Sequence, residues 1–570
     1  MERQAGTASA INQDAIAAIS ATAAPGVLRD AARLLQPVRR MLEASAVIAS
    51  SGPPPAGAFC PVTAAGERPR HRYQPPQPRQ PAVTALSDIP AGSPGEEELA
   101  WMTAADIAAG VAGGYLSPGQ LAAACGRRVE ALDGHLGTFV TVTIDAARAS
   151  AGGRAAPAAP AGAMTGPGAG PLAGVPVGLK DIIDVAGVPT TCGSRIRAGH
   201  VPSHDAACWE RIREAGALLA GKLATHEFAA GVTCEDTPFG TVRNPLDTRH
   251  MAGGSSGGPA AAVAAGLVTA AVGTDTGGSI RIPAACCGVV GLKPTFGLVP
   301  TDGVQPLAWS LDHVGPLART VRDAALVLDV LAGTSCEPAA RSGAQHGADG
   351  LRVGVPVEWL GGLQQEVRTA FADALHDLRL AGAEITEVRG LPDPEDLALV
   401  NRVIAYAEGS ACHDQLLRSG APFGESTLPR MQAGRFLLAG EYLAAQRLRA
   451  GACRSFARAW AEADILATPT LPCTAPLLGT ATLRTGGRAE PLGTALIRYT
   501  AGFNLAGLPA LTVPSRTPGP LPAGLQLIGP PMEDHLVCFA AAAYERARGA
   551  DSPSPVPPLS GTDSVRTETR

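Results

Sequence analysis

Lysine is almost absent from this sequence. Of its 46 lysine and arginine residues only three are lysine, at positions 180, 222 and 293. Arginine does not release its proton in a protein, whereas a buried lysine can be driven towards the neutral amine. Lys180, which follows an apolar stretch in GVPVGLKD, is therefore open to two interpretations. It is either a neutral amine needed for chemistry or a structural ion-pair partner.

The sequence also lacks a basic net charge and the cysteine and histidine motifs of metal sites, which excludes several classes of protein. The net charge is −5, so no basic face for nucleic acid or an anionic membrane is expected. The twelve cysteines include no CxxC pair, zinc spacing or disulfide framework, which favours a reducing, cytoplasmic setting. His226 begins HEFAA but lacks the second histidine of a zinc-protease helix. We therefore expect no nucleic-acid partner and no metal.

Membrane segments are also not expected. The start, MERQAGTASA, lacks the apolar core of a signal peptide. The uncharged run 252–274 is long enough to span a bilayer, but glycine, alanine and serine dominate it. We interpret this run as buried loop, helix and strand, because a membrane helix needs larger apolar side chains.

The composition divides the chain into three parts. Residues 1–95 form a predicted helical and Pro-rich extension, with short helices broken at Pro25 and Pro37 and then a basic, Pro-rich linker. This linker is either a solvated tether or a binding segment for a partner. Residues 96–550 form the main globular domain, and residues 551–570 form a Ser/Pro-rich tail that we expect to be disordered.

Strands and helices alternate within residues 96–550, which predicts a layered α/β fold. Ser117 is a candidate N-cap for a helix with Pro118 in its first turn. Residues 151–170 are a low-complexity surface loop. Strands are predicted at 137–143, 174–185 and 464–472, and within 503–531, and a last helix is predicted around 536–550.

Two glycine-serine stretches carry the chemical signal. GGSSGG at 253–258 precedes an Ala-rich helix, and TDTGGS at 274–279 follows an apolar strand. Such glycines let several backbone N–H groups point at one spot, which suits a phosphate or an oxyanion. The first stretch is neither a Walker A loop nor GxGxxG, and the second is not GxSxG. Ser279 as a nucleophile would therefore need another base, and a neutral lysine can serve.

In their order and spacing these pieces resemble the amidase signature family, from about Glu98 to Ala550. GVPVGLKD, GGSSGGPAAAVAAG, GTDTGGSIRIPAACCGVVGLKPT and SLDHVGPLARTV carry the resemblance, together with NLAGLPALTVP and AGLQLIGPP. The resemblance implies a central mixed β-sheet covered by helices on both faces. It also implies these roles: Ser279 as nucleophile, Ser255 after a cis peptide bond as proton relay, Lys180 as base, the N–H groups of Thr276, Gly277, Gly278 and Ser279 as oxyanion hole, and Ser256 in support.

One position departs from the family pattern, because Pro259 stands where the family has a further serine. The other two lysines, Lys222 and Lys293, are expected to be structural. Asp275 and Arg281 flank the nucleophile, and we expect a structural ion pair or an anchor for the loop rather than direct catalysis.

The resemblance predicts an amidohydrolase that cleaves a small-molecule carboxamide through an acyl-enzyme, with no cofactor. The glutaminase subunit of a tRNA-dependent amidotransferase is a rival, and a catalytically silent scaffold is a third interpretation. A homodimer or a small accessory protein stays open as partner, and residues 41–61 are loosely similar to such accessory subunits. The sequence does not identify the substrate. The resemblance implies that specificity comes from the variable region after about residue 300, which includes Trp309, Arg402, Tyr406 and Arg430.

Overall fold

The computed structural model describes residues 95–144 and 170–549, together with the short stretches 35–36, 40, 73–74 and 76. Most of the predicted extension, nearly all of the loop at 151–170 and the whole tail at 551–570 lie outside the described residues. Leu35, Gln36 and Arg40 are helical, where the sequence predicts short helices.

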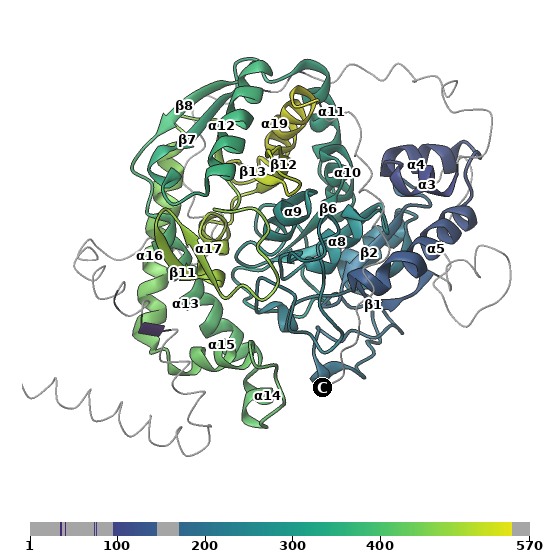
Figure 1. The fold of residues 1–570 in the computed structure, drawn as a ribbon, viewed down its shortest axis with the longest axis horizontal. Coiled ribbons are helices and arrows are strands. Elements are labelled where there is room, and N and C mark those ends of the chain that lie inside the picture. The colour runs from purple at the N-terminus through teal and green to yellow at the C-terminus, as the bar shows by residue number, and fades with distance from the viewer. Residues whose placement is uncertain are drawn as a thin grey trace, which may run out of the picture.

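An 11-stranded mixed sheet forms the centre of the molecule (Figure 1). Its strand order is β1-β3-β2-β4-β6-β5-β12-β13-β9-β7-β8. Strand β2 runs parallel to both β3 and β4, whereas β6, β5, β12 and β13 continue the sheet through antiparallel pairs. The strands are β1 (Phe139–Val142), β2 (Pro176–Lys180), β3 (Leu218–Leu223), β4 (Ala270–Asp275), β5 (Val290–Lys293), β6 (His313–Ala318), β7 (Arg352–Pro356), β8 (Glu384–Val388), β9 (Ile465–Pro469), β12 (Ala510–Ser515) and β13 (Ala523–Ile528).

Helices cover both faces of this sheet, as the resemblance predicts. Every residue of β2, β4, β5, β6, β12 and β13 is buried, which is typical of strands covered on two sides. The helices are α3 (Glu96–Trp101), α4 (Ala104–Ala112), α5 (Pro118–Leu136), α7 (Ala207–Glu214), α8 (Gly257–Ala264), α9 (Arg281–Cys287), α10 (Val321–Ala332), α11 (Cys336–His346), α12 (Gln365–Leu380), α13 (Pro394–Cys412), α14 (Asp414–Arg418), α15 (Leu428–Ala433), α16 (Ala439–Ala459), α17 (Leu492–Ile497), α18 (Ala501–Leu505) and α19 (Asp534–Ala547).

Smaller elements complete the fold. A hairpin of β10 (Thr482–Thr485) and β11 (Arg488–Pro491) stands apart from the main sheet. Within the described residues, the 3-10 turns η3 (Arg195–Arg197), η4 (Glu227–Ala229), η5 (Val357–Leu360) and η6 (Gly434–Phe436) lie in the connections.

Local sequence explains several of these boundaries. Ser117 caps α5 by accepting from the Gln120 N–H, and the Gln120 side chain accepts from the Ser117 N–H in return. Pro118 is the first residue of that helix, as predicted. The uncharged run 252–274 forms a loop, α8 and most of β4, all buried, so its interpretation as core is confirmed.

Candidate active site

The site lies at one edge of the sheet, where two parallel strands end together. Lys180 is the last residue of β2, and Asp275 is the last residue of β4. Because β2 and β4 are parallel neighbours, their carboxyl ends meet at the same edge. The loop that follows β4 carries Ser279, so the topology brings the two sequence motifs close together.

Lys180 is fully buried and faces two hydroxyl groups. Its Nζ lies 2.7 Å from Ser255 Oγ and 2.8 Å from Thr274 Oγ1. Burial lowers the pKa of Lys180 to about 7, and the nearby Cys234, Asp275 and Asp312 offset only part of this effect. An amine with such a pKa is largely available as a proton acceptor above neutrality.

The other two lysines are also fully buried but have different partners. Lys222 Nζ forms an ion pair with Asp181 at 3.1 Å and donates to Thr190 Oγ1. Lys293 Nζ donates to the carbonyl oxygens of Leu508 and Pro294. A carboxylate and carbonyl groups can only accept hydrogen bonds, whereas a hydroxyl can also donate to a neutral amine. Among the hydrogen bonds of the described residues, Lys180 alone of the three lysines has only hydroxyl partners, which suits a base.

The loop before α8 presents the serines of GGSSGG. The peptide bond between Gly254 and Ser255 is cis, as the resemblance implies. Further along, a Cβ on Gly258 would lie 2.5 Å from the backbone nitrogen and oxygen of Ala224, so only glycine fits at this contact. Pro259 occupies the first turn of α8, where its missing N–H leaves no helical hydrogen bond unmade.

Ser256 supports the base through a neighbouring threonine. Its Oγ donates to the Thr274 carbonyl at 3.2 Å and lies 3.4 Å from the Thr274 N–H. Thr274 in turn holds Lys180 through its own hydroxyl. Thr274 is a site residue that the sequence reasoning missed, although it stands inside the TDTGGS motif.

Ser279 reaches this cluster through the backbone and is nearly buried, with 6% of its surface exposed. The Ser256 N–H donates to the Ser279 carbonyl at 3.1 Å, which ties the two serine loops together. Among the hydrogen bonds of the described residues, none joins the hydroxyls of Ser255 and Ser279. The structure therefore links Lys180 to Ser255 directly and to Ser256 through Thr274, whereas Ser279 joins this network only through its backbone carbonyl.

The loop from 276 to 279 offers free amides, but not at every expected position. The Gly278 N–H donates to Asp275 Oδ1 at 2.7 Å, so this donor is already used and the expectation for it needs correction. The N–H groups of Thr276, Gly277 and Ser279 donate to no protein acceptor within the described chain. These three amides remain candidates for an oxyanion hole.

Asp275 and Arg281 form the expected ion pair under this loop. Arg281 Nη2 lies 2.9 Å from Asp275 Oδ1, and both side chains are fully buried. Burial opposes the charge on Asp275, but Arg281 outweighs it and holds the pKa of this carboxyl far below its ordinary value. Arg281 also donates to Gln526 Oε1 on β13 and to Asn504 Oδ1 on α18, which anchors the pair to both elements.

Three more polar residues brace the loop. Asp312 lies in the SLDHVGPLARTV stretch, whereas Asn401 and Thr500 belong to no motif of the sequence. Asn401 on α13 donates to the Thr276 carbonyl, and Thr500 donates to the Gly277 carbonyl. The Thr276 hydroxyl donates to Asp312 at 2.6 Å. Since the Thr276 and Gly277 carbonyls are held this way, the peptide planes of the loop have fixed orientations.

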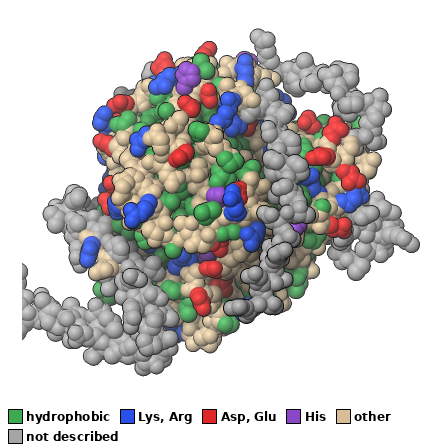
Figure 2. Space-filling model, viewed as in Figure 1, with side chains coloured by type: hydrophobic (Ala, Val, Ile, Leu, Met, Phe, Trp, Pro, Cys, Tyr) green, Lys and Arg blue, Asp and Glu red, His purple; other side chains and the backbone are tan. Residues whose placement is uncertain are grey.

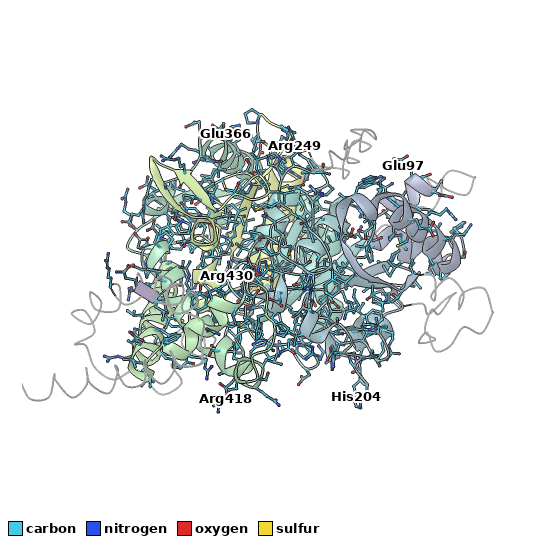
Figure 3. The ribbon with its side chains drawn as sticks, turned by 60° about the horizontal axis from the view of Figure 1, so that its bottom comes forward. Glu97, His204, Arg249, Glu366, Arg418 and Arg430 are labelled. Atoms are coloured by element: carbon cyan, nitrogen blue, oxygen red, sulfur yellow. The ribbon has the colours of Figure 1, made fainter. Side chains whose placement is uncertain are left out.

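The variable region contributes a cation near the site. Arg430 on α15 donates to the Ala230 carbonyl, and its Nη1 lies 3.4 Å from His226 Nε2. The backbone N–H of His226 donates to the Ser255 carbonyl. Burial, together with Arg430 and Lys180, lowers the pKa of His226 to about 3, so this ring is neutral. In Figure 3 Arg430 lies towards the middle of the molecule, unlike the labelled residues at its rim.

The other residues singled out in this region lie elsewhere. Arg402 donates to Thr494 Oγ1, and Tyr406 packs in a small cluster with Leu35. Trp309 is 55% exposed. The sequence alone did not separate these residues from Arg430.

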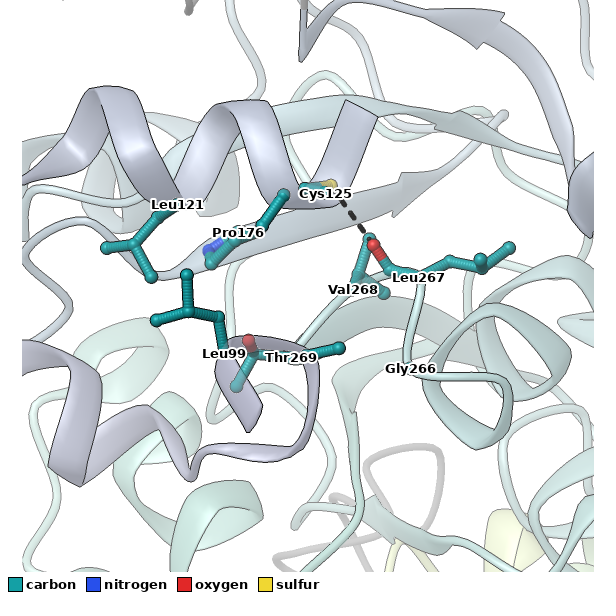
Figure 4. A pocket seen from close by; sticks show the side chains of 10 residues that line it. Leu99, Leu121, Cys125, Pro176, Gly266, Leu267, Val268 and Thr269 are labelled. Carbon is teal, nitrogen blue, oxygen red and sulfur yellow. Dashed lines mark hydrogen bonds between the residues drawn. The ribbon is translucent and has the colours of Figure 1, made fainter. Parts of the chain in front are cut away.

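A small cavity lies at the opposite edge of the sheet (Figure 4). Its volume is about 20 Å³, and Leu99, Leu121, Cys125, Pro176 and Val268 are among its lining residues. Pro176 begins β2, whereas Lys180 ends it, so this cavity is separate from the catalytic edge. Its size suits a single water and no substrate.

Comparison with known proteins agrees with this geometry. The family model described as Amidase matches residues 120–538. A glutamyl-tRNA(Gln) amidotransferase subunit of Anaeromyxobacter sp. (strain K) is 42% identical over 500 residues, covering 81% of this chain and 99% of the relative. The chain belongs to the amidase signature family, whose members hydrolyse amide C–N bonds.

Two solved structures illustrate the range of similar proteins. A protein complex that reveals the evolutionary origins of an s-triazine catabolic enzyme, solved with an inhibitor, has a TM-score of 0.71 and 33% identity, covering 79% of this chain and 99% of that one. A bacterial aryl acylamidase of the amidase signature family has a TM-score of 0.69 and 28% identity. The match covers 80% of this chain and 97% of that one.

Two further observations concern membranes and charge. Among the helices of the described residues, none has both the length and the apolar character needed to cross a bilayer. On the face in Figure 2, acidic and basic side chains are interspersed and no extended patch of one sign is visible.

Proposed function

We propose that this protein is a serine-dependent amidase in which Lys180 is the base, Ser255 the relay and Ser279 the nucleophile. The contact of 2.7 Å between the Lys180 amine and the Ser255 hydroxyl carries the proposal. A hydroxyl can accept and donate at once, so Ser255 takes the Ser279 proton while it passes its own to Lys180. The freed Ser279 oxygen then attacks the amide carbonyl.

The remaining steps follow from the same groups. The amides of Thr276, Gly277 and Ser279 would stabilise the oxyanion that forms on the substrate. Lys180, through Ser255, returns the proton to the leaving nitrogen, the C–N bond breaks, and an acyl-enzyme ester remains on Ser279. A water molecule deprotonated by the same relay attacks this ester, which releases the carboxylic acid and restores the Ser279 hydroxyl.

We infer that the substrate is a primary amide and that glutamine is the first candidate. The relatives named as glutamyl-tRNA(Gln) amidotransferase subunits are 37–42% identical to this chain, and this supports a glutaminase reaction. Arg430 supports it too, because its guanidinium lies beside the loop of His226 and Ser255 and could attract an anionic substrate group. Within a multi-subunit amidotransferase, the chain would release ammonia for use by partner proteins.

A second candidate is a stand-alone amidase for small molecules. The similarity to the aryl acylamidase favours it. Both candidates share the acyl-enzyme on Ser279 and differ only in the acid and amine that are released.

The test compares wild type and Ser279→Ala with glutamine and with a panel of aryl amides, ureas and small carboxamides. Ammonia and acid release are followed. Release of glutamate and ammonia from glutamine supports the glutaminase candidate, and turnover of other amides alone supports the second. If no amide is turned over and a fluorophosphonate does not label Ser279, the proposed function is wrong.

A further inference from the structure

The N-terminal extension has a buried contact with the amidase domain. Leu35 is only 1% exposed and forms a cluster with the fully buried Ala433. Tyr406, Phe436 and Leu437 pack against this pair. Its neighbour Gln36 is exposed, so this turn presents an apolar side chain inward and a polar one outward. The short purple segment beside α16 in Figure 1 marks this place.

A second contact holds the extension at another part of the domain. The Tyr73 ring lies 5.6 Å from the Phe539 ring on α19, at an angle of 41°. The Pro76 carbonyl accepts a hydrogen bond from Ser342 Oγ on α11 at 2.5 Å. Phe539 and Ser342 are both fully buried, so the extension contacts the core of the domain at this place. One apolar contact, and one contact that combines tilted aromatic rings with a hydrogen bond, therefore fix two points about forty residues apart in sequence.

The Leu35 contact lies where two site-bearing helices meet. Ala433 ends α15, which carries Arg430, and Tyr406 belongs to α13, which carries Asn401. Arg430 reaches the Ala230 carbonyl and approaches His226, whereas Asn401 holds the Thr276 carbonyl. Each helix thus sends one polar side chain to a catalytic loop, and Leu35 packs at the junction behind them.

We propose that Leu35 is an intramolecular clasp between the N-terminal extension and the amidase domain. It docks on the surface formed by Tyr406, Ala433, Phe436 and Leu437 and holds α13 and α15 in the positions that support the catalytic loops. Tyr73 and Pro76 make the second contact between the same extension and the amidase domain. The occupant of the docking surface is this chain's own extension, because Leu35 is already buried in it. The proposal does not depend on the identity of the substrate.

Hydrogen exchange in the full-length protein tests the clasp without any catalytic readout. In Leu35→Asp, a buried charge should expel the segment, and amides of residues 428–437 and 394–412 should exchange at least about tenfold faster. Gln36→Asp is the matched control, because its side chain is exposed on the same turn, and it should exchange like wild type. Equal exchange in both variants and wild type would overturn the proposal.

Two further measurements guard against a folding artefact and identify the occupant. If Leu35→Asp accelerates exchange in β4 and α9 as well, the milder Leu35→Ala is measured, and an effect confined to α13, α15 and η6 is still required. A photoreactive benzoylphenylalanine at position 35 should cross-link to residues 433–437 within one chain. A product of doubled mass would identify a second copy as the occupant, and no cross-link to this surface would rule out docking; either result overturns the intramolecular clasp.

Discussion

Lys180 and Lys222 lie on neighbouring parallel strands, and their side chains point to opposite faces of the sheet. Lys180 pairs with Leu223 in the register, whereas Lys222 pairs with Leu179. Because successive strand residues alternate between faces, the amine of Lys180 meets Ser255 while that of Lys222 meets Asp181 on the other side. The adjacent Lys180 and Asp181 therefore lie on opposite faces of the sheet, and the proposed mechanism uses only Lys180.

Replacing the nucleophile should abolish turnover without unfolding the protein. Ser279→Ala should lower kcat for the amide found in the screen by at least about 10⁴-fold, since a triad loses most of its acceleration when its nucleophile is removed. Steady-state kinetics and a melting curve check this. Ser203→Ala, at an exposed serine, is the control and should keep full activity. Turnover by Ser279→Ala near the wild-type rate would mean that another group attacks.

The base should tolerate neither a neutral nor a permanently charged substitute. Lys180→Met lacks the amine, and Lys180→Arg keeps a charge that cannot accept a proton. Both variants should lose about 10³-fold or more in kcat, in line with the loss of a general base and its network. Single-turnover rates of acyl-enzyme formation are the measurement. An active Lys180→Arg variant would contradict the neutral-amine mechanism.

The rate should depend on pH through Lys180. Its pKa is lowered from the ordinary value to about 7 by burial, and the mechanism needs the unprotonated amine. Below pH 7 the amine is protonated, so the rate should fall about tenfold per pH unit; it should level off above pH 8. A profile of kcat/KM between pH 5 and 9 checks this. A rate that is constant across that range would exclude Lys180 as the titrating base.

Thr274 should raise the pKa of the Lys180 amine. Its hydroxyl accepts a hydrogen bond from the Lys180 amine at 2.8 Å, which favours the protonated form. Thr274→Val keeps the shape and removes the acceptor, so the acidic limb of the profile should move to lower pH. Thr334→Val removes a hydroxyl bonded to Asp329, away from the site, and should leave the limb in place. A shift to higher pH in Thr274→Val would contradict the assigned hydrogen bond.

The ion pair under the nucleophile loop should be important for stability. Arg281→Met leaves the fully buried Asp275 carboxylate without its partner, and breaking such a pair costs about 3–5 kcal/mol. The exposed pair of Arg389 and Glu387, with side chains 65% and 63% exposed, is the control, and Arg389→Met should cost less than about 1 kcal/mol. Denaturant unfolding compares the two variants. Equal losses would show that the buried pair has no special role.

The sequence predicted what depends on local pattern. The strands predicted at 174–185 and 464–472, the Ser117 cap and the positions of both serine loops follow from periodicity, glycine placement and capping residues. The partners that brace the loop could not be found this way. Asn401 and Thr500 lie far from the loop in sequence and belong to no motif, so only the folded chain reveals their contacts with the loop. The contact of Leu35 is hidden for the same reason, because any apolar residue of a short helix could have made it.

The burial of all three lysines has a practical consequence. Each ε-amine of the sequence is inaccessible to solvent in the folded chain. Amine-directed reagents such as succinimidyl esters should therefore leave these side chains unmodified until the protein opens. Acylation of lysine then reports unfolding directly, and attachment or cross-linking of the native protein must use groups other than the lysine side chains.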